Sequence, residues 1–160
     1  ESGVLAMTPK RHGIQQLLDA ASAQAAPGAE AKAITLTVEP TDLTARFDPK
    51  WTAEALYNLV DNAVKYTPAG GAVTLRAVGY ELFCRVDVTD TGPGIPESEQ
   101  ARIFQRFYRS PSASEAEGVG IGLYLARQIA AGQGGYLKVS SRPGEGSTFS
   151  LFLPRAEERT

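Results

Sequence analysis

The sequence predicts an α/β fold of two layers, with helices on one face of a mixed, largely antiparallel sheet. Stretches with alternating apolar residues occur in pairs, and amphipathic helical stretches lie between the pairs. No internal repeat and no second set of such elements is visible in the sequence. At 160 residues and 42% hydrophobic content, the chain has the size and composition of one globular domain.

The first half of the chain is predicted to hold a connecting segment, two helices and a pair of strands. The first helix has apolar residues on one face and is expected to end at Pro27-Gly28. In the second helix, Asp48 is placed to cap the first turn and Pro49 occupies the first position. The predicted bounds are 1–13 for the connecting segment, 14–26 and 49–66 for the helices, and 34–38 and 43–47 for the strands, which should pair across the turn at 39–42.

The second half is predicted to add two strand pairs and two helices. Between those helices, residues 110–118 are small, polar and acidic, which is typical of a mobile loop. The predicted domain covers residues 14–154, and 155–160 form a tail. The predicted bounds are 72–78, 81–88, 136–140 and 147–153 for the strands, and 97–106 and 120–133 for the helices.

Composition excludes several classes of function. A net charge of −2 gives no broad positive field, so nucleic-acid binding is not expected. Cys84, the single cysteine, excludes an intrachain disulfide and fits a reducing compartment, and strand alternation points it inward as an inert thiol. No apolar run approaches the about 20 residues of a membrane span, and no signal peptide is present. Because the chain opens on Glu1, we expect a cytoplasmic fragment of a longer protein.

The first polar motif lies on the second predicted helix, in the run Asn58-Leu-Val-Asp-Asn62-Ala-Val-Lys65-Tyr66. Glu54, Asn58 and Asn62 recur every four residues and therefore share one helix face. An amide oxygen together with phosphate oxygens and water suits Mg²⁺, and Lys65 offers a positive charge for a phosphate. A solvated polar face opposite the apolar stripe would give the same spacing.

The second motif is Asp90, which ends a predicted strand, followed by the turn Gly92-Pro-Gly94-Ile95. An ionised carboxylate only accepts hydrogen bonds, so it could accept from the exocyclic amino group of adenine. Guanine has a carbonyl oxygen at the matching position and would be rejected. The glycines let the backbone approach a ring closely. A strand-ending Asp-Gly turn without a ligand is the alternative.

The third and fourth motifs flank the predicted loop. Gly118, Gly120 and Gly122 lie where a helix begins, and such a helix start binds anions. A plain loop-to-helix junction is the alternative, although each glycine weakens a helix interior. The P-loop signature is absent from the sequence. Arg109 could pair with a terminal phosphate from the loop, while the neighbouring phenylalanines are expected to pack in the core.

These motifs, spread over residues 34–154, resemble the N, G1, F and G2 boxes of the ATP-binding catalytic domain of bacterial sensor histidine kinases. That family belongs to the wider group of DNA gyrase, the Hsp90 chaperones and the MutL proteins. The run 58–68 matches the kinase form of the first box nearly letter for letter. The resemblance implies the Bergerat α/β sandwich, ATP and Mg²⁺ as cofactors, and protein-histidine kinase activity in a two-component phosphorelay.

The resemblance also assigns roles to individual residues. Asn62 would be the Mg²⁺ ligand, and Thr148 would reach adenine through an ordered water. The implied catalytic residues are Asn58, Lys65 and Arg109. The implied nucleotide-binding residues are Asn58, Asn62, Lys65, Tyr66, Asp90, Gly92, Gly94, Ile95, Arg109, Gly118, Gly120, Gly122, Leu123 and Thr148.

Two departures bear on the reaction, one from the ATPases of the wider group and one from the complete kinases. Its ATPases place a water-activating glutamate one helical turn before the metal asparagine, where this chain has Asn58, which is not a base. The pocket is therefore expected to hold ATP for transfer rather than hydrolysis. The acceptor motif His-Glu-x-x-Thr-Pro of the kinases is not matched, since His12, the sole histidine, lacks these neighbours.

The resemblance implies an acceptor histidine on a separate dimerisation domain, upstream of residue 1, and a response regulator beyond it. The fragment would be monomeric, and the parent a homodimer anchored in the bacterial inner membrane. Two alternatives stay open at this point. They are a hydrolysing clamp of the gyrase, Hsp90 or MutL type, and a nucleotide-sensing module without transfer activity.

Overall fold

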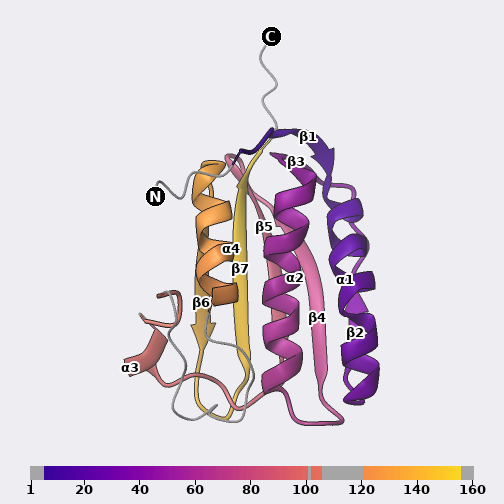
Figure 1. Ribbon diagram of the computed structural model, residues 1–160, viewed down its shortest axis with the longest axis vertical. Coiled ribbons are helices and arrows are strands. Elements are labelled where there is room, and N and C mark those ends of the chain that lie inside the picture. The colour runs from indigo at the N-terminus through magenta and orange to yellow at the C-terminus, as the bar shows by residue number, and fades with distance from the viewer. Residues whose placement is uncertain (1–5, 101, 106–120, 156–160) are drawn as a thin grey trace.

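The computed structural model describes residues 6–100, 102–105 and 121–155, and in them three long helices cover one face of a five-stranded sheet (Figure 1). The elements are β1 (Lys10–Gly13), α1 (Ile14–Ala31), β2 (Thr35–Val38), β3 (Thr44–Phe47), α2 (Pro49–Tyr66), β4 (Ala72–Gly79), β5 (Phe83–Asp90), α3 (Glu97–Gln100), α4 (Ile121–Gly132), β6 (Tyr136–Ser141) and β7 (Ser147–Pro154). The strand order is β2-β4-β5-β7-β6, with β2 and β4 parallel and the other neighbours antiparallel. This arrangement confirms the predicted two-layer sandwich.

Helix α1 is longer than predicted, because Pro27 lies inside it instead of ending it. Ala25 and Ala29, on either side of the proline, are buried in the core. Their packing outweighs the loss of the one helical hydrogen bond that proline cannot donate. The helix ends at Ala31, Lys32 forms its C-cap, and Ala33 follows with a left-handed φ of 61°.

The predicted hairpin of 34–38 with 43–47 is wrong. β2 pairs in parallel with β4, and β3 pairs with β1 in a separate two-stranded sheet. β1 lies in the segment that was predicted to be a connection, and its sequence Lys-Arg-His-Gly has no apolar alternation. Leu36 and Val38 of β2 pack against the main core, which explains why this strand joins the edge of the large sheet.

The core lies between the sheet and α1, α2 and α4. Alternation along β7 and the helical stripe of α2 supply its centre, as the periodicity predicted. These buried residues are Ala55, Leu56, Leu59, Val60, Ala63, Phe149, Leu151 and Leu153. Cys84 is also fully buried, and burial raises the pKa of its thiol to about 11. The thiol is therefore protonated at neutral pH, as expected for an inert core residue.

A buried polar network fixes α2 relative to α4. Asp48 caps α2 as predicted, since its Oδ1 accepts from the Trp51 N–H at 3.0 Å. The Asp48 N–H donates to Gln133 Oε1 at 2.6 Å, and Gln133 Nε2 donates to Thr52 Oγ1 at 2.8 Å. Gln133 follows the end of α4, so the network ties that end to the start of α2.

The remaining predicted elements are shorter or cannot be compared. α3 ends at Gln100, and the predicted helix over 97–106 continues only as turns at 102–104. The predicted loop at 110–118 lies outside the described residues. Within the described ranges, no helix has the length and apolar character needed to cross a membrane.

Candidate functional site

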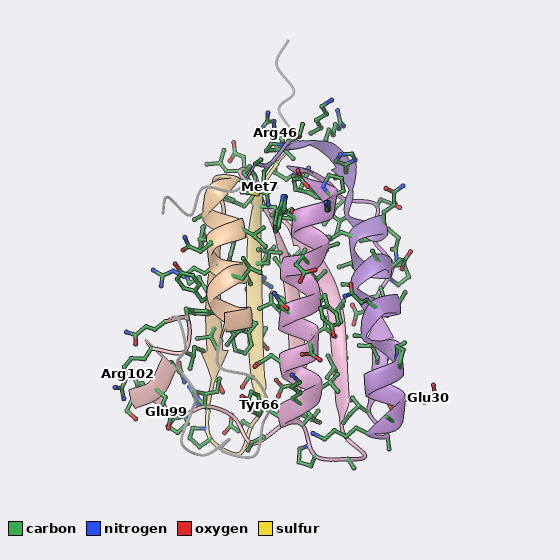
Figure 2. All side chains as sticks on the ribbon, in the orientation of Figure 1. Met7, Glu30, Arg46, Tyr66, Glu99 and Arg102 are labelled. Atoms are coloured by element: carbon green, nitrogen blue, oxygen red, sulfur yellow. The ribbon has the colours of Figure 1, made fainter. Side chains whose placement is uncertain are left out.

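Those predicted site residues that the structure describes gather at the end of the sandwich where α2 finishes and α4 begins (Figure 1). Figure 2 shows Tyr66, the last residue of α2, at this end and Met7 at the opposite end. Asp90 ends β5, and Ser147 begins β7 directly opposite it in register. Residues that are far apart in the sequence therefore meet at one edge of the sheet.

Asp90 is the buried acid of this site. Asp90 is only 7% exposed, and its Oδ1 accepts a hydrogen bond from the Gly92 N–H at 2.8 Å. Burial raises the pKa of Asp90 above the ordinary value, and backbone N–H groups of Gly92 and Ser147 offset that rise only in part. A desolvated carboxylate of this kind gains from a further hydrogen-bond donor.

A second polar group beside Asp90 has no partner. Thr67 is fully buried, and among the described residues its Oγ1 makes no hydrogen bond. A Cβ placed on Gly92 would lie 3.0 Å from Asp90 Oδ1, 3.1 Å from the Tyr66 carbonyl oxygen and 3.4 Å from Thr67 Oγ1. Three oxygens thus surround Gly92. Thr67 carries no sequence signal of its own, because a threonine after a helix is ordinary.

The glycine turn after Asp90 packs against the β6–β7 connection. Gly94 has a φ of +82°, and a Cβ there would overlap the carbonyl oxygen of Arg142. The Ile95 N–H donates to Ser141 Oγ at 2.7 Å. Position 94 therefore requires glycine for both its conformation and its close approach.

The polar face of α2 borders the same end of the molecule. Asn58 and Asn62 are half-buried and lie one turn apart on this face, whereas Glu54 is exposed. Lys65 Nζ lies 3.2 Å from Asp61 Oδ2 on the same helix. Because both side chains are well exposed, this ion pair is weak and a phosphate could replace Asp61.

The start of α4 lies beside this polar face. A Cβ on Gly122 would lie 3.6 Å from Asn58 Cγ and 3.7 Å from its Oδ1, which are ordinary contact distances. α4 has 12 residues, and the N–H groups and dipole at the start of such a helix favour an anion next to Asn58. Leu123 packs against the core. The predicted site residues Arg109, Gly118 and Gly120 lie outside the described residues.

The structure places Thr148 away from Asp90. Thr148 is paired in register with Thr89, and their hydroxyl oxygens are 3.1 Å apart. Side chains alternate faces along a strand, so Thr148 lies on the face opposite to Asp90. Ser147, which is 6% exposed, takes the place beside Asp90 instead. Two adjacent hydroxyl residues follow Gly146, and only the strand register decides between them.

Comparison with known proteins shows which family the chain belongs to. A model described as "Histidine kinase-, DNA gyrase B-, and HSP90-like ATPase" matches residues 47–157. The chain belongs to this ATPase family. The adaptive-response sensory kinase SasA of Synechococcus sp. (strain JA-3-3Ab) is 42% identical over 131 residues, which are 80% of this chain and 35% of SasA. The sensor protein DivL of Caulobacter vibrioides is 37% identical over 160 residues, which are 99% of this chain and 20% of DivL.

Solved structures agree with this membership of the ATPase family. The mycobacterial sensor histidine kinase MprB superposes with a TM-score of 0.82 at 27% identity, covering 94% of this chain and 100% of that one. Full-length ShkA in complex with AMPPNP superposes with a TM-score of 0.83 at 29% identity, covering 98% of this chain and 33% of ShkA. The chain therefore corresponds to the ATP-binding catalytic domain of sensor kinases and spans about a fifth to a third of its curated relatives.

Proposed function

We propose that this chain is the catalytic domain of a two-component sensor histidine kinase. It holds Mg-ATP and presents the γ-phosphate to a histidine on a dimerisation domain of the same protein. The observation that carries the proposal is the buried Asp90 carboxylate at the head of the glycine turn, beside the Thr67 hydroxyl, which has no hydrogen-bond partner in the described part of the chain. Its relatives SasA and DivL, named as a sensory kinase and a sensor protein, support it.

The adenine base would lie against Asp90. The carboxylate accepts a hydrogen bond from the exocyclic amino group, and this bond offsets part of the desolvation that raises its pKa. Gly92 and Gly94 let the ring approach the backbone, while Ile95 and Tyr66 border it. Ser147, on the same side of the sheet as Asp90, replaces Thr148 as the hydroxyl residue of the base pocket.

The phosphates would lie between α2 and the start of α4. Asn62 would hold Mg²⁺ through its amide oxygen, with phosphate oxygens and water completing the shell. Held there, Mg²⁺ would supply positive charge that neutralises the phosphates. The phosphates would contact Asn58, Lys65 and Gly122, and a Cβ built on Gly122 would lie within contact distance of Asn58. On the family pattern, Arg109 would approach the terminal phosphate, Gly120 would receive phosphates together with Gly122, and Gly118 would belong to the same nucleotide-binding set.

Transfer fits this site better than hydrolysis. Asn58 stands one turn before Asn62 and cannot take a proton from water, and Glu54 is exposed a further turn away. In the proposed reaction a histidine nitrogen attacks the γ-phosphorus, the bond to the β–γ bridging oxygen breaks, and ADP leaves. His12, packed on Phe47 at a ring distance of 5.4 Å, lies in β1 at the end of the molecule opposite Tyr66.

Phosphotransfer to a separate domain tests this function. The chain is mixed with a histidine-bearing dimerisation domain of a sensor kinase and ATP labelled at the γ-phosphate. We expect label on that domain and none when its histidine is replaced by alanine. Steady-state ATP hydrolysis by the chain alone, abolished by Glu54→Ala, would favour a clamp. Nucleotide binding without label on histidine would favour a sensing module.

Asn62→Ala is expected to remove most of the Mg²⁺ dependence of ATP binding. Loss of one metal ligand should weaken Mg-ATP about tenfold, or about 1.4 kcal/mol, while ADP binding in EDTA stays unchanged. Calorimetric titrations with and without Mg²⁺ measure both effects. Asp61→Asn, a change at the residue directly before Asn62 in α2, is the matched control and should keep the full Mg²⁺ dependence. If metal-free ADP weakens equally in Asn62→Ala, Asn62 is not the metal ligand.

ADP affinity is expected to fall as the pH is lowered. The fall should begin at a higher pH than it would if Asp90 had the pKa of an ordinary aspartate. Only the ionised Asp90 offers all its lone pairs to the base, and burial raises the pKa of this group. The effect of Asp90 on stability has the opposite sign. Because the folded state holds this proton more tightly than the unfolded chain does, ionised Asp90 disfavours folding at neutral pH, and this penalty fades as the pH falls through the raised pKa. Titrations at decreasing pH, with Asp90→Asn as the reference lacking this transition, check the binding effect.

A further inference from the structure

We propose that Ser141, assisted by Gln100, is a positioning residue of the base pocket. Neither residue belongs to the predicted nucleotide-binding set. Together they fasten the glycine turn that carries Ile95 onto the β6–β7 connection, and so fix the wall against which the base lies. This inference rests on the proposed function for its effect on binding, although the fastening itself is visible without a nucleotide.

The Ser141 hydroxyl joins three segments of the chain. Its Oγ accepts the Ile95 N–H at 2.7 Å and donates its proton to the Gly146 carbonyl at 2.9 Å. Ser147 Oγ lies 2.8 Å from the same oxygen. A hydroxyl has one proton, and that of Ser141 is already given to Gly146, so Ser147 is the donor in this pair. One side chain thus connects the glycine turn, the β6–β7 turn and the first residue of β7.

Gln100 completes the fastening from α3. Its Nε2 donates to the Ile95 carbonyl at 2.8 Å and to the Ser141 carbonyl at 2.9 Å. Ile95 is therefore held by its N–H through Ser141 and by its carbonyl through Gln100. The Gly144 N–H adds a backbone bond to the Pro93 carbonyl at 2.6 Å. Three of these bonds, from Ile95 to Ser141, from Gln100 to Ser141 and from Gly144 to Pro93, span 41 to 51 positions of the sequence, and together they restrict the movement of the turn.

The fastening has a direct consequence for the pocket. The Ser147 proton is committed to Ser141, so the Ser147 hydroxyl offers only acceptor capacity to a base or a bridging water. Loss of the Ser141 hydroxyl would free the Ile95 N–H and the Ser147 proton at once. Ile95 lies in the turn that follows Asp90, and Ser147 lies opposite Asp90 in register.

Ser141→Ala tests the proposal, with Ser140→Ala as its matched control. Ser140 is the exposed neighbour whose side chain points to the other face of the sheet. In hydrogen exchange followed by NMR, the Ile95 amide should exchange about fivefold faster or more in Ser141→Ala, as expected for loss of one hydrogen bond. ADP affinity should fall about fivefold, and the gain from Mg²⁺ with ATP should stay unchanged. Ser140→Ala should change neither, and Ser141→Thr should restore both.

Unchanged exchange of the Ile95 amide in folded Ser141→Ala, or unchanged ADP affinity beside faster exchange, would overturn the proposal. A lower melting temperature with unchanged ADP affinity would also overturn it, because Ser141 would then have a structural role alone. If Ser141→Ala fails to fold, Gln100→Met removes the donors to Ile95 from the opposite side and is judged by the same two measurements. If the unaltered chain binds no ADP, the proposed function fails, whereas the exchange of Ile95 still reports on the fastening.

Discussion

Asp90→Asn is expected to weaken ADP binding about 30-fold and to leave GDP binding as it is in the wild type. A hydrogen bond to a charged acceptor contributes about 2 kcal/mol, and an asparagine at this position would either keep one neutral acceptor or turn its NH₂ group toward the amino group of adenine. Because GDP carries a carbonyl oxygen there, it gains nothing from the native aspartate. Calorimetric titration of the two nucleotides against the wild type and the variant measures the difference.

Asp87→Asn is the matched control for this prediction. Asp87 lies on the same strand and is 4% exposed, but its carboxylate accepts from Ser150 at 2.7 Å and lies 2.9 Å from Arg85 Nε. Residues 87 and 90 point to opposite faces of the sheet. The Asp87 change should therefore lower stability and leave ADP affinity intact. Equal losses of ADP and GDP in Asp90→Asn would contradict the assignment of Asp90 to the adenine amino group.

Gly94→Ala is expected to disrupt the base pocket and to be the more damaging change for the fold. A Cβ on Gly94 would overlap the Arg142 carbonyl oxygen, and the φ of +82° disfavours any side chain. The strained conformation alone costs about 1–2 kcal/mol. Relief of the overlap must push the turn away from β6, so ADP binding should fall below detection. Thermal unfolding and calorimetry on the same sample separate the two effects.

Gly144→Ala isolates the conformational part of that cost. Gly144 has a φ of +83°, but a Cβ there would meet nothing within 4 Å. This variant should lose about 1–2 kcal/mol of stability and retain ADP affinity. If both glycine variants lose the same stability and both still bind ADP, the close packing of the turn against Arg142 has no role in the pocket.

Local signals in the sequence predicted the helices better than the strand pairing. The bounds of α2 are as predicted because Asp48, Pro49 and the apolar stripe act within a few residues of each other. The pairing of β1 with β3 brings Lys10 opposite Phe47, across the whole of α1, and no pattern in Lys-Arg-His-Gly marks it. At Pro27 the burial of neighbouring alanines overrode a signal that usually ends a helix.

The site shows the same division between local and tertiary information. Asp90 and its glycine turn were recognisable because the acid and the glycines are adjacent. The roles of Thr67 and Ser141 could not be recognised in the sequence. Thr67 comes near Gly92 only in the folded structure, and Ser141 accepts a hydrogen bond from Ile95 that spans 46 positions. The choice between Ser147 and Thr148 depended on the register of β7, which a single residue of shift reverses.

Titration of the folded chain with ADP in a calorimeter tests the central claim most directly. The claim is that one buried carboxylate at the end of β5 recognises the adenine base. We expect a saturable heat for ADP that fits a single site, with little heat for GDP and little for ADP in Asp90→Asn. A chain that unfolds cooperatively yet gives no heat with ADP, ATP or a non-hydrolysable ATP analogue would contradict the claim.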